Sequence, residues 1–232
     1  MDAVAAFFHR ATALKKQEKV LHKIRYSTLF CLFIIGSVLG FVLEGVWCVL
    51  MRGHWENHTA TVWGPFCIIY GIGAVMVYLF SALLKNANLP VQFAVFTVSG
   101  AAVEYFGSLF QELCFGSVSW DYSGHVFNLG GRVSLKMALM WGILGTVFMR
   151  FAFPQVHRLF EKMRGTGCRI ACIGMTVFMA ANLLVTSAAV MRWRARMTDV
   201  DATNPVEDWL DRTYDDQTMA GLFPNMRFTL SE

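Results

Sequence analysis

The sequence predicts an all-α protein, a polytopic transmembrane helix bundle with about five membrane-spanning helices, a short amphipathic N-terminal arm and a polar C-terminal tail. Three observations support this prediction. Hydrophobic residues make up 56% of the 232 residues, charged residues make up only 16%, and the mean hydropathy is +0.47. An ordinary soluble domain carries a larger charged fraction. The apolar residues also gather in runs that approach the roughly 20 residues a helix needs to cross the hydrocarbon core.

The N-terminal arm, residues 1–27, is basic, with six lysines and arginines ahead of the first apolar run. That run is too long for a secretory signal and contains Glu44, so it is interpreted as a retained membrane anchor. By the positive-inside rule the arm is predicted to lie in the cytoplasm. Its charge is therefore attributed to topology and to anionic lipid head groups, and no nucleic-acid partner is expected.

The membrane core, residues 28–154, is predicted to contain four helices, followed by a basic connector at 155–169 and a fifth transmembrane helix at 170–192. From a cytoplasmic arm, the loops Arg52–Gly64 and Gly116–Gly131 fall outside and the connector falls inside, as its basic residues favour. A fifth crossing would carry Arg192, Arg194 and Arg196 outside, against the rule. Either one apolar segment is re-entrant, or the bias of the first four spans outweighs these arginines. The apolar runs are Thr28–Met51, Phe66–Leu84, Leu89–Phe115, Val133–Phe153 and Ile170–Met191.

The tail, residues 193–232, is predicted to contain a short amphipathic helix. Asn204, Pro205 and Glu207 have the types and spacing of a helix cap, a first-turn proline and a capping-box glutamate. Apolar residues then recur at helical spacing, at Val206, Trp209, Leu210 and Tyr214. Such a helix either docks onto the membrane domain or binds a separate partner.

Two carboxylates lie inside the apolar runs: Glu44 in the first and Glu104 in the third. A carboxylate in a membrane segment usually faces a partner, a cavity or a ligand. With a rise of about 1.5 Å per residue, both reach the outer half of the bilayer, because the two spans run in the same direction. The second and fourth spans run the opposite way, so their early residues occupy the same half. The predicted intramembrane polar site therefore consists of Glu44, Tyr70, Glu104, Glu112, Arg132 and Lys136.

Small and polar residues recur every three or four positions on the two helices that carry these glutamates. On the first span they are Gly36, Gly40 and Glu44, and on the third they are Thr97, Gly100, Glu104, Ser108 and Gln111. Small residues let membrane helices approach closely. The spacing therefore predicts tight helix contacts with both glutamates pointing inward.

Two interpretations of this site remain open. Glu44 or Glu104 could form a buried ion pair with Arg132 or Lys136 and fix the helix packing, or the cluster could bind a ligand, an ion or a proton. The aromatic and amide-rich loops above the cluster favour binding, and they are predicted to form a lid. The lid residues are Trp63, Pro65, Trp120, Asp121, Tyr122, Ser123 and Asn128. Tryptophan and tyrosine at these positions would equally suit an interfacial aromatic belt.

No metal site and no cofactor are predicted. His54 and His58 are four residues apart with Glu56 between them, but a third firm ligand is missing from the pattern. The chain contains no phosphate-binding loop and no known hydrolase motif, so it is not expected to hydrolyse nucleotide by itself. The six cysteines form no CxxC pair and are interpreted as small buried hydrophobic residues. A disulfide remains open among three that lie toward one membrane face, Cys48, Cys67 and Cys114.

An ordered set of motifs in the core resembles a known family. The motifs are Gly64-Pro65-Phe66-Cys67-Ile68-Ile69-Tyr70-Gly71-Ile72-Gly73, Val103-Glu104-Tyr105 with Glu112, Trp120-Asp121-Tyr122-Ser123, Phe127-Asn128-Leu129-Gly130-Gly131-Arg132 and Trp141-Gly142. They resemble small bacterial membrane proteins described as putative ABC-transporter type IV permeases, of the CmpB kind, and distantly the animal transmembrane protein 229. The resemblance covers roughly Leu32 to Pro154, and Phe223-Pro224-Asn225-Met226 is similar to a tail of the bacterial members. It implies a multi-pass protein of the bacterial cytoplasmic membrane that works with a separate ATPase subunit.

Three functions are consistent with these observations. The first is a permease-like protein whose outer-half site binds a small polar solute, an ion or a proton, with Arg132 and Lys136 as counter-charges; about five spans would need a homo-oligomer to enclose a pathway. The second is a membrane enzyme acting on a lipid or envelope precursor, with Glu104 or Asp121 as general base. The third is a non-catalytic regulatory or scaffold protein that uses its C-terminal helix.

Overall fold

The computed structural model describes residues 24–162 and 165–229, so residues 1–23 of the predicted arm lie outside it. It confirms the predicted all-α membrane bundle. Four helical segments are long and apolar enough to cross a membrane, Tyr26–Arg52, Leu89–Phe115, Leu135–Lys162 and Thr166–Met197, and Ile68–Leu83 is a shorter apolar helix. The helices are α2 (Tyr26–Arg52), α3 (Ile68–Leu83), α4 (Leu89–Phe115), α5 (Leu135–Val147), the π-helical turn η1 (Phe148–Ala152), α6 (Phe153–Lys162), α7 (Thr166–Met197), α8 (Pro205–Thr213) and α9 (Asp216–Leu222). The short strands are β1 (Ser117–Val118), β2 (Asn128–Leu129), β3 (Val133–Ser134) and β4 (Arg227–Phe228).

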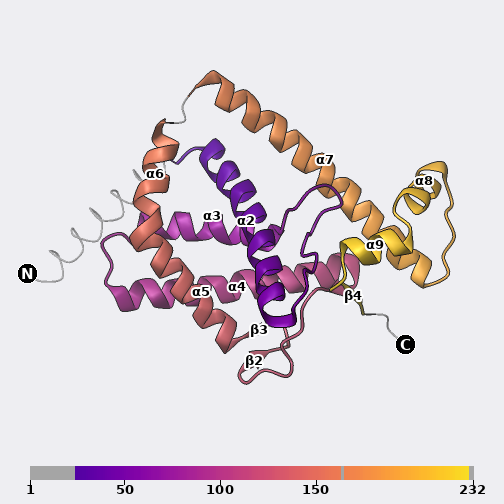
Figure 1. Cartoon of the computed structure of the whole chain (residues 1–232), viewed down its shortest axis with the longest axis horizontal. Coiled ribbons are helices and arrows are strands. Elements are labelled where there is room, and N and C mark those ends of the chain that lie inside the picture. The colour runs from indigo at the N-terminus through magenta and orange to yellow at the C-terminus, as the bar shows by residue number, and fades with distance from the viewer. Residues whose placement is uncertain (1–23, 163–164, 230–232) are drawn as a thin grey trace, which may run out of the picture.

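The bundle is built from two closely packed helix pairs. Helix α2 packs mainly on α3, and α4 packs mainly on α5, while the long helix α7 runs along the outside and contacts α2 and α4 (Figure 1). The outer faces are strongly apolar: Leu113 of α4 is 77% exposed and Leu184 of α7 is 72% exposed. Side chains of this kind require lipid rather than water around them.

Local signals explain where the helices begin and end. The Asn88 side chain accepts a hydrogen bond from the backbone N–H of Val91 and caps α4, with Pro90 in the first turn. Gly116, with φ at +60°, ends the same helix in the left-handed conformation that favours glycine. Ser134 caps α5 by accepting from the backbone N–H of Met137.

The fourth span extends past the predicted end at Phe153. Helix α5 continues through η1 into α6, so that Leu135–Lys162 forms one 28-residue helical segment. The π-helical turn lies directly before Pro154, which lacks the N–H that an uninterrupted α-helix would use. Because α6 carries polar and charged residues on one face, a search for apolar runs in the sequence does not detect this helix.

The C-terminal tail docks onto the membrane domain. Strand β4 pairs antiparallel with β1, and the backbone N–H of Thr229 donates to the carbonyl of Gly116 over 2.8 Å. The tail also contributes most of a buried apolar cluster with the end of α7 and the first loop: Val62, Ala189, Val190, Trp193, Leu210, Tyr214, Met219 and Phe223. The end of α7 therefore lies on the same side as the loops 53–67 and 116–134, and the α3–α4 turn lies on the other side.

Acidic residues of the tail pair with two arginines at the end of α7, Arg192 and Arg196. Arg192 donates from Nε and Nη2 to the two carboxylate oxygens of Asp211 over 3.0 and 2.6 Å. Arg196 pairs with the same carboxylate and with Asp216. Arg192 and Arg196 therefore belong to an ion-pair network with the tail.

Candidate functional site

Glu104 lies in the middle of α4 and is buried, with 7% of its surface exposed. Its Oε1 atom accepts a hydrogen bond of 3.1 Å from the indole Nε1–H of Trp141 on α5. Its Oε2 atom has no hydrogen-bond partner among the described residues. A buried carboxylate oxygen without a partner is costly, so this atom marks a place where a proton, an ion or a polar ligand would be stabilised.

Glu44 lies on α2 across a pair of aromatic rings from Glu104. The hydroxyl of Tyr70, in the first turn of α3, donates to Glu44 Oε1 over 2.5 Å. The rings of Tyr70 and Trp141 are neighbours, with their centroids 6.1 Å apart. The four side chains therefore form one connected group, the acid–aromatic cluster, which consists of Glu44, Tyr70, Glu104 and Trp141.

Glycines on the neighbouring helices make room for the two aromatic rings. A Cβ atom at Gly40 would overlap the Tyr70 ring, and a Cβ atom at Gly73 would overlap the Trp141 ring. At Gly100 a Cβ atom would overlap Cβ and Cγ of Trp141, which are close to the α5 backbone. The glycines therefore allow the helices to pack closely, and this packing holds the two rings beside the glutamates.

The predicted counter-charges lie apart from this cluster. Arg132 donates to the hydroxyl of Ser108 over 3.1 Å and pairs with Glu112, so these residues form a separate ion pair near the end of α4. Lys136 is exposed in the first turn of α5. Within residues 24–162 and 165–229, neither Glu44 nor Glu104 forms an ion pair with a basic side chain. The ion pairs that were one interpretation of the sequence are not formed.

The loop between α4 and α5 is held by its own polar side chains. Trp120 donates from Nε1 to the carbonyl of Arg132 over 2.9 Å. Asn128 donates to the carbonyls of Ser123 and His125 and accepts from the backbone N–H of Gly131. These hydrogen bonds fold the loop back on itself. The polar groups of Trp120 and Asn128, two of the predicted lid residues, are therefore hydrogen-bonded within the loop.

Asp121 is engaged within the same loop. Its Oδ1 accepts from the backbone N–H of Ser123 over 2.8 Å, and its Oδ2 accepts from the Ser123 hydroxyl over 3.0 Å. These two hydrogen bonds hold the pKa of the exposed Asp121 carboxyl below its usual range. A carboxylate that is stabilised in this way is a weak proton acceptor, so the structure does not favour Asp121 as a general base.

Tyr122 is the loop residue that is linked to the acid–aromatic cluster. Burial raises the pKa of its hydroxyl, and the nearby carboxylates of Glu104 and Glu44 raise it further. The Tyr122 hydroxyl is therefore a neutral group beside the two acids. The neighbouring residues Asp121 and Ser123 are exposed.

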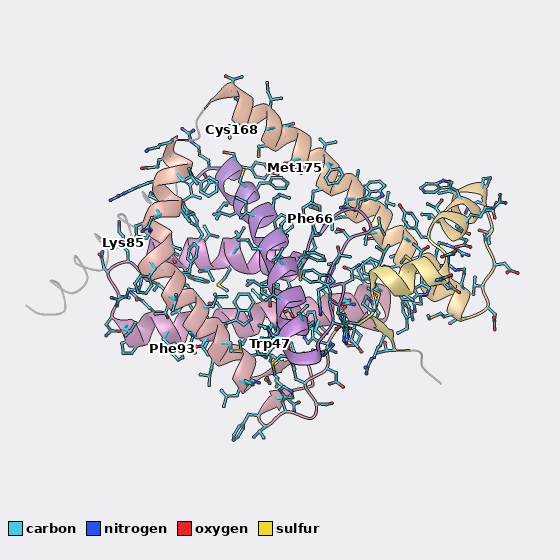
Figure 2. All side chains as sticks on the ribbon, in the orientation of Figure 1. Trp47, Phe66, Lys85, Phe93, Cys168 and Met175 are labelled. Atoms are coloured by element: carbon cyan, nitrogen blue, oxygen red, sulfur yellow. The ribbon has the colours of Figure 1, made fainter. Side chains whose placement is uncertain are left out.

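Trp63 and Pro65 lie in the first loop, where the Trp63 backbone contacts α7. Asn182 of α7 donates to the carbonyl of Trp63 over 2.7 Å and accepts from its backbone N–H over 3.1 Å, so this amide holds the first loop rather than a neighbouring helix. Phe66 lies between α2 and α7 (Figure 2), with its ring centroid 6.4 Å from that of Phe178. Pro65 is exposed next to it. These residues fasten α7 to the bundle.

Sequence reasoning did not assign a role to Trp141. The residue appeared only within the Trp141-Gly142 motif, and its apolar surroundings gave no sign that its N–H would meet Glu104. A buried indole N–H generally donates to a hydrogen-bond acceptor, so a tryptophan in an apolar span indicates that an acceptor lies nearby.

All six cysteines are free thiols, so no disulfide joins Cys48, Cys67 and Cys114. Their interpretation as small buried residues holds for Cys48, Cys67 and Cys172, whereas Cys31 and Cys168 are partly exposed and Cys114 is exposed. Cys48, however, lies beside two polar residues of the first loop. Its Sγ is 3.1 Å from Nε2 of His58 and 3.5 Å from Oε2 of Glu56.

The comparisons with known proteins agree with this architecture. The chain gave no match to a curated protein or to a solved structure. The comparison with protein families matched residues 31–187 to the family described as putative ABC-transporter type IV. The match extends beyond the expected end at Pro154 and includes most of α7, so the family match covers the fifth span as well. Because the match covers well over half of the 232 residues, together with the helices and loops that build the acid–aromatic cluster, the chain belongs to the putative ABC-transporter type IV family.

Proposed function

We propose that the protein is a permease-like membrane protein that binds a proton or a small cation between Glu44 and Glu104, in the outer half of the bilayer. One observation carries this proposal: two carboxylates lie in one acid–aromatic cluster of an apolar bundle, and among the described residues no basic side chain is paired with either of them. The desolvation cost of such carboxylates must be offset by a proton, a cation or a hydrogen-bonding ligand.

The hydrogen bonds of the cluster favour a positively charged occupant. Trp141 and Tyr70 each donate to only one oxygen of their glutamate. When the Glu104 carboxylate is ionised, its unpartnered Oε2 can only accept hydrogen bonds, and its negative charge would repel an anionic ligand. The faces of Tyr70 and Trp141 also attract cations. Arg132 is already paired with Glu112 and would not compete for the site.

The substitution Glu104→Gln tests this proposal. The purified protein is reconstituted in liposomes containing a pH-sensitive dye, and the initial rate of proton entry is measured under an imposed membrane potential. We expect the wild-type rate to exceed that of protein-free liposomes and the Glu104→Gln rate to fall to the protein-free level. The amide retains an acceptor oxygen for Trp141, so thermal stability is expected to change by less than about 1 kcal/mol.

Tyr105→Phe is the matched control, because Tyr105 adjoins Glu104 on α4 and forms no polar contact within the described residues. This variant is expected to keep the wild-type rate. The same liposomes are also tested with sodium and potassium gradients, using dyes for those ions. Wild-type liposomes as tight as protein-free ones for all three ions would overturn the proposal.

We infer further that the N-terminal side of α2 faces the cytoplasm and that the tail faces the outside of a bacterial cytoplasmic membrane. The distribution of basic residues supports this orientation. Lys85, Arg150 and Arg158 border an open cavity of about 580 Å³ on the side of the α3–α4 turn. On the tail side, Arg192 and Arg196 at the end of α7 are paired with acidic residues.

Reporter fusions test this orientation. Alkaline phosphatase is expected to be active when fused to the C-terminus and close to background when fused after Lys162, because phosphatase folds only outside the cytoplasm. A fluorescent-protein fusion at the same two positions should give the reverse pattern. A fluorescent C-terminal fusion with an inactive phosphatase would contradict the inferred side of the tail.

The family name hints at a separate ATPase subunit, and we propose that such a subunit would approach from the side of the basic cavity. Helix α6 forms part of that side, and its Phe153, His157 and Arg158 line the cavity. The acid–aromatic cluster lies toward the opposite side. A homo-oligomer would complete a pathway around the cluster, since the exposed apolar faces of α2 and α4 can be covered by lipid or by a second copy.

A further inference from the structure

Three potential metal ligands meet where α2 ends. Cys48 lies in the last turns of this helix, and Glu56 and His58 lie in the loop that follows. Gly53, with φ at +79°, ends the helix in the left-handed conformation, and its N–H donates to the carbonyl of Val49. The chain then returns toward the helix, which brings the two loop residues beside the thiol.

The distances between the three ligand atoms fit one metal ion. Cys48 Sγ is 3.1 Å from His58 Nε2 and 3.5 Å from Glu56 Oε2, and these nitrogen and oxygen atoms are 3.6 Å apart. Tetrahedral zinc bound by sulfur, nitrogen and oxygen requires separations of roughly 3.4–3.6 Å, given metal–ligand bonds of about 2.0–2.3 Å. Changes of a few tenths of an ångström in the side chains would therefore complete the geometry.

The surroundings suit a bound metal ion. The amide nitrogen of Asn225 lies 3.5 Å from Nδ1 of His58, so the ring nitrogen that does not face Cys48 has a polar neighbour. A flipped amide would place the Asn225 oxygen there as an acceptor for Nδ1–H, the usual support for a metal-bound histidine. Cys48 is buried, whereas the Glu56 and His58 side chains are 16% and 19% exposed, which leaves a path for an ion to enter.

Arg52 currently pairs with the Glu56 oxygen that faces the thiol. It would compete with a cation for that atom, or it would stay on the carboxylate while the other oxygen binds the metal. The ligand set has a thiolate, an imidazole and a carboxylate, which together suit a borderline divalent ion. Asp or Glu clusters that select calcium or magnesium have only oxygen ligands.

We propose that Cys48, Glu56 and His58 form a binding site for a divalent transition-metal ion of the zinc type, with three protein ligands and a fourth position open to water or to an external ligand. The site joins the end of α2, the first loop and the Phe223–Met226 segment of the tail through Asn225. It does not depend on the proposed function, because it uses neither Glu44 nor Glu104.

Cobalt(II) provides the direct probe. The purified full-length protein, stripped of metal in detergent, is titrated with Co²⁺ and followed by absorption. We expect one equivalent to bind with a thiolate-to-cobalt charge-transfer band in the near ultraviolet and tetrahedral d–d bands in the visible. Zinc should displace the cobalt and abolish both signals.

Matched variants identify the ligands. Cys48→Ala is expected to abolish the charge-transfer band and His58→Ala to weaken binding at least about tenfold, while Asn225→Ala weakens it by about tenfold through the histidine. The controls Cys114→Ser and His54→Ala should bind as the wild type does, because neither residue reaches the cluster. Glu104→Gln should also leave cobalt binding unchanged, so failure of this proposal and failure of the proton or cation site are distinguishable.

The wild type alone can overturn the proposal. Absence of a saturable cobalt signal would show that the three side chains are only a hydrogen-bonded packing cluster. Persistence of the charge-transfer band in Cys48→Ala would place the thiolate elsewhere and equally refute the assignment. Each variant is first checked by size-exclusion chromatography, and Arg52→Gln, which frees the Glu56 carboxylate, should bind cobalt at least as tightly as the wild type.

Discussion

Replacing Asp211 by alanine is expected to lower the free energy of unfolding by about 3 kcal/mol, because it leaves two arginines without their shared partner. Arg192 is only 7% exposed and uses both its Nε and Nη2 atoms on this carboxylate. Arg196 also pairs with it. The buried guanidinium of Arg192 would keep its contact with the carbonyl of Val200 and its longer 3.8 Å ion pair with Glu207, but it would lose both short hydrogen bonds to Asp211.

The measurement is thermal unfolding in detergent, combined with limited proteolysis of the tail. Asp211→Ala should release the segment after α7 to protease at a lower temperature than the wild type. Asp208→Ala is the matched control: Asp208 lies on the same helix and pairs only with the exposed Arg212. An exposed pair of this kind contributes less than about 1 kcal/mol. Equal losses in both variants would show that the network does not hold the tail.

The same network gives a pH dependence whose sign is fixed. Hydrogen bonds from Arg192, followed by the contacts of Arg196, hold the pKa of Asp211 below its usual range in the folded protein. Its contribution to stability is therefore complete above the unfolded-state pKa of about 3.9 and is lost as the pH falls through the lower folded-state pKa. The stability difference between wild type and Asp211→Ala should consequently shrink below about pH 4.

The sequence predicted the spans well where hydrophobicity alone decides them. The third span was expected at Leu89–Phe115 and α4 has those bounds, because Asn88 and Gly116 are strong signals for a helix start and end. The fourth and fifth spans were expected to be shorter than they are. Their extra turns, in α6 and at both ends of α7, carry polar and charged residues. The turns in α6 and at the C-terminal end of α7 are stabilised by contacts with other segments.

The close approach of the helices at Gly40 and Gly100 also followed from the spacing of small residues along the helices. The pairing of the charges did not. Whether Arg132 meets Glu104 or Glu112 depends on the rotation of α4 about its axis and on the path of the loop before α5, and neither is encoded in a one-dimensional pattern. Arg132 lies in that loop near the end of α4, where Glu112 is the nearer acid.

The proposed metal site did not follow from the sequence, for a related reason. The four-residue spacing of His54 and His58 suits a pair of metal ligands. His54, however, points elsewhere, because its Nδ1 atom contacts the carbonyl of Arg52. The third ligand is Cys48, which belongs to an apolar helix and was interpreted as a packing residue. Only the reversal of the chain at Gly53 brings it to the loop, and a single glycine in a polar loop does not specify that geometry.

Gly100→Ala is expected to destabilise the protein by about 3 kcal/mol, the upper end of the range for overpacking, although it adds only one methyl group. The new Cβ would overlap Cβ and Cγ of Trp141. Those atoms are next to the α5 backbone and cannot rotate away as the end of a flexible side chain could. The two helices must therefore separate, and separation also lengthens the hydrogen bond between Trp141 and Glu104 that lies one turn further along α4.

Gly174→Ala on α7 is the matched control, since nothing lies within 4 Å of a Cβ atom there. Alanine is the better helix former, so this substitution should be neutral or slightly stabilising. Thermal unfolding of both variants separates steric contact from helix propensity. If Gly100→Ala unfolds at the wild-type temperature, α4 and α5 are not in close contact at this position. Helix packing at Gly100 would then not be what holds the hydrogen bond from Trp141 to Glu104.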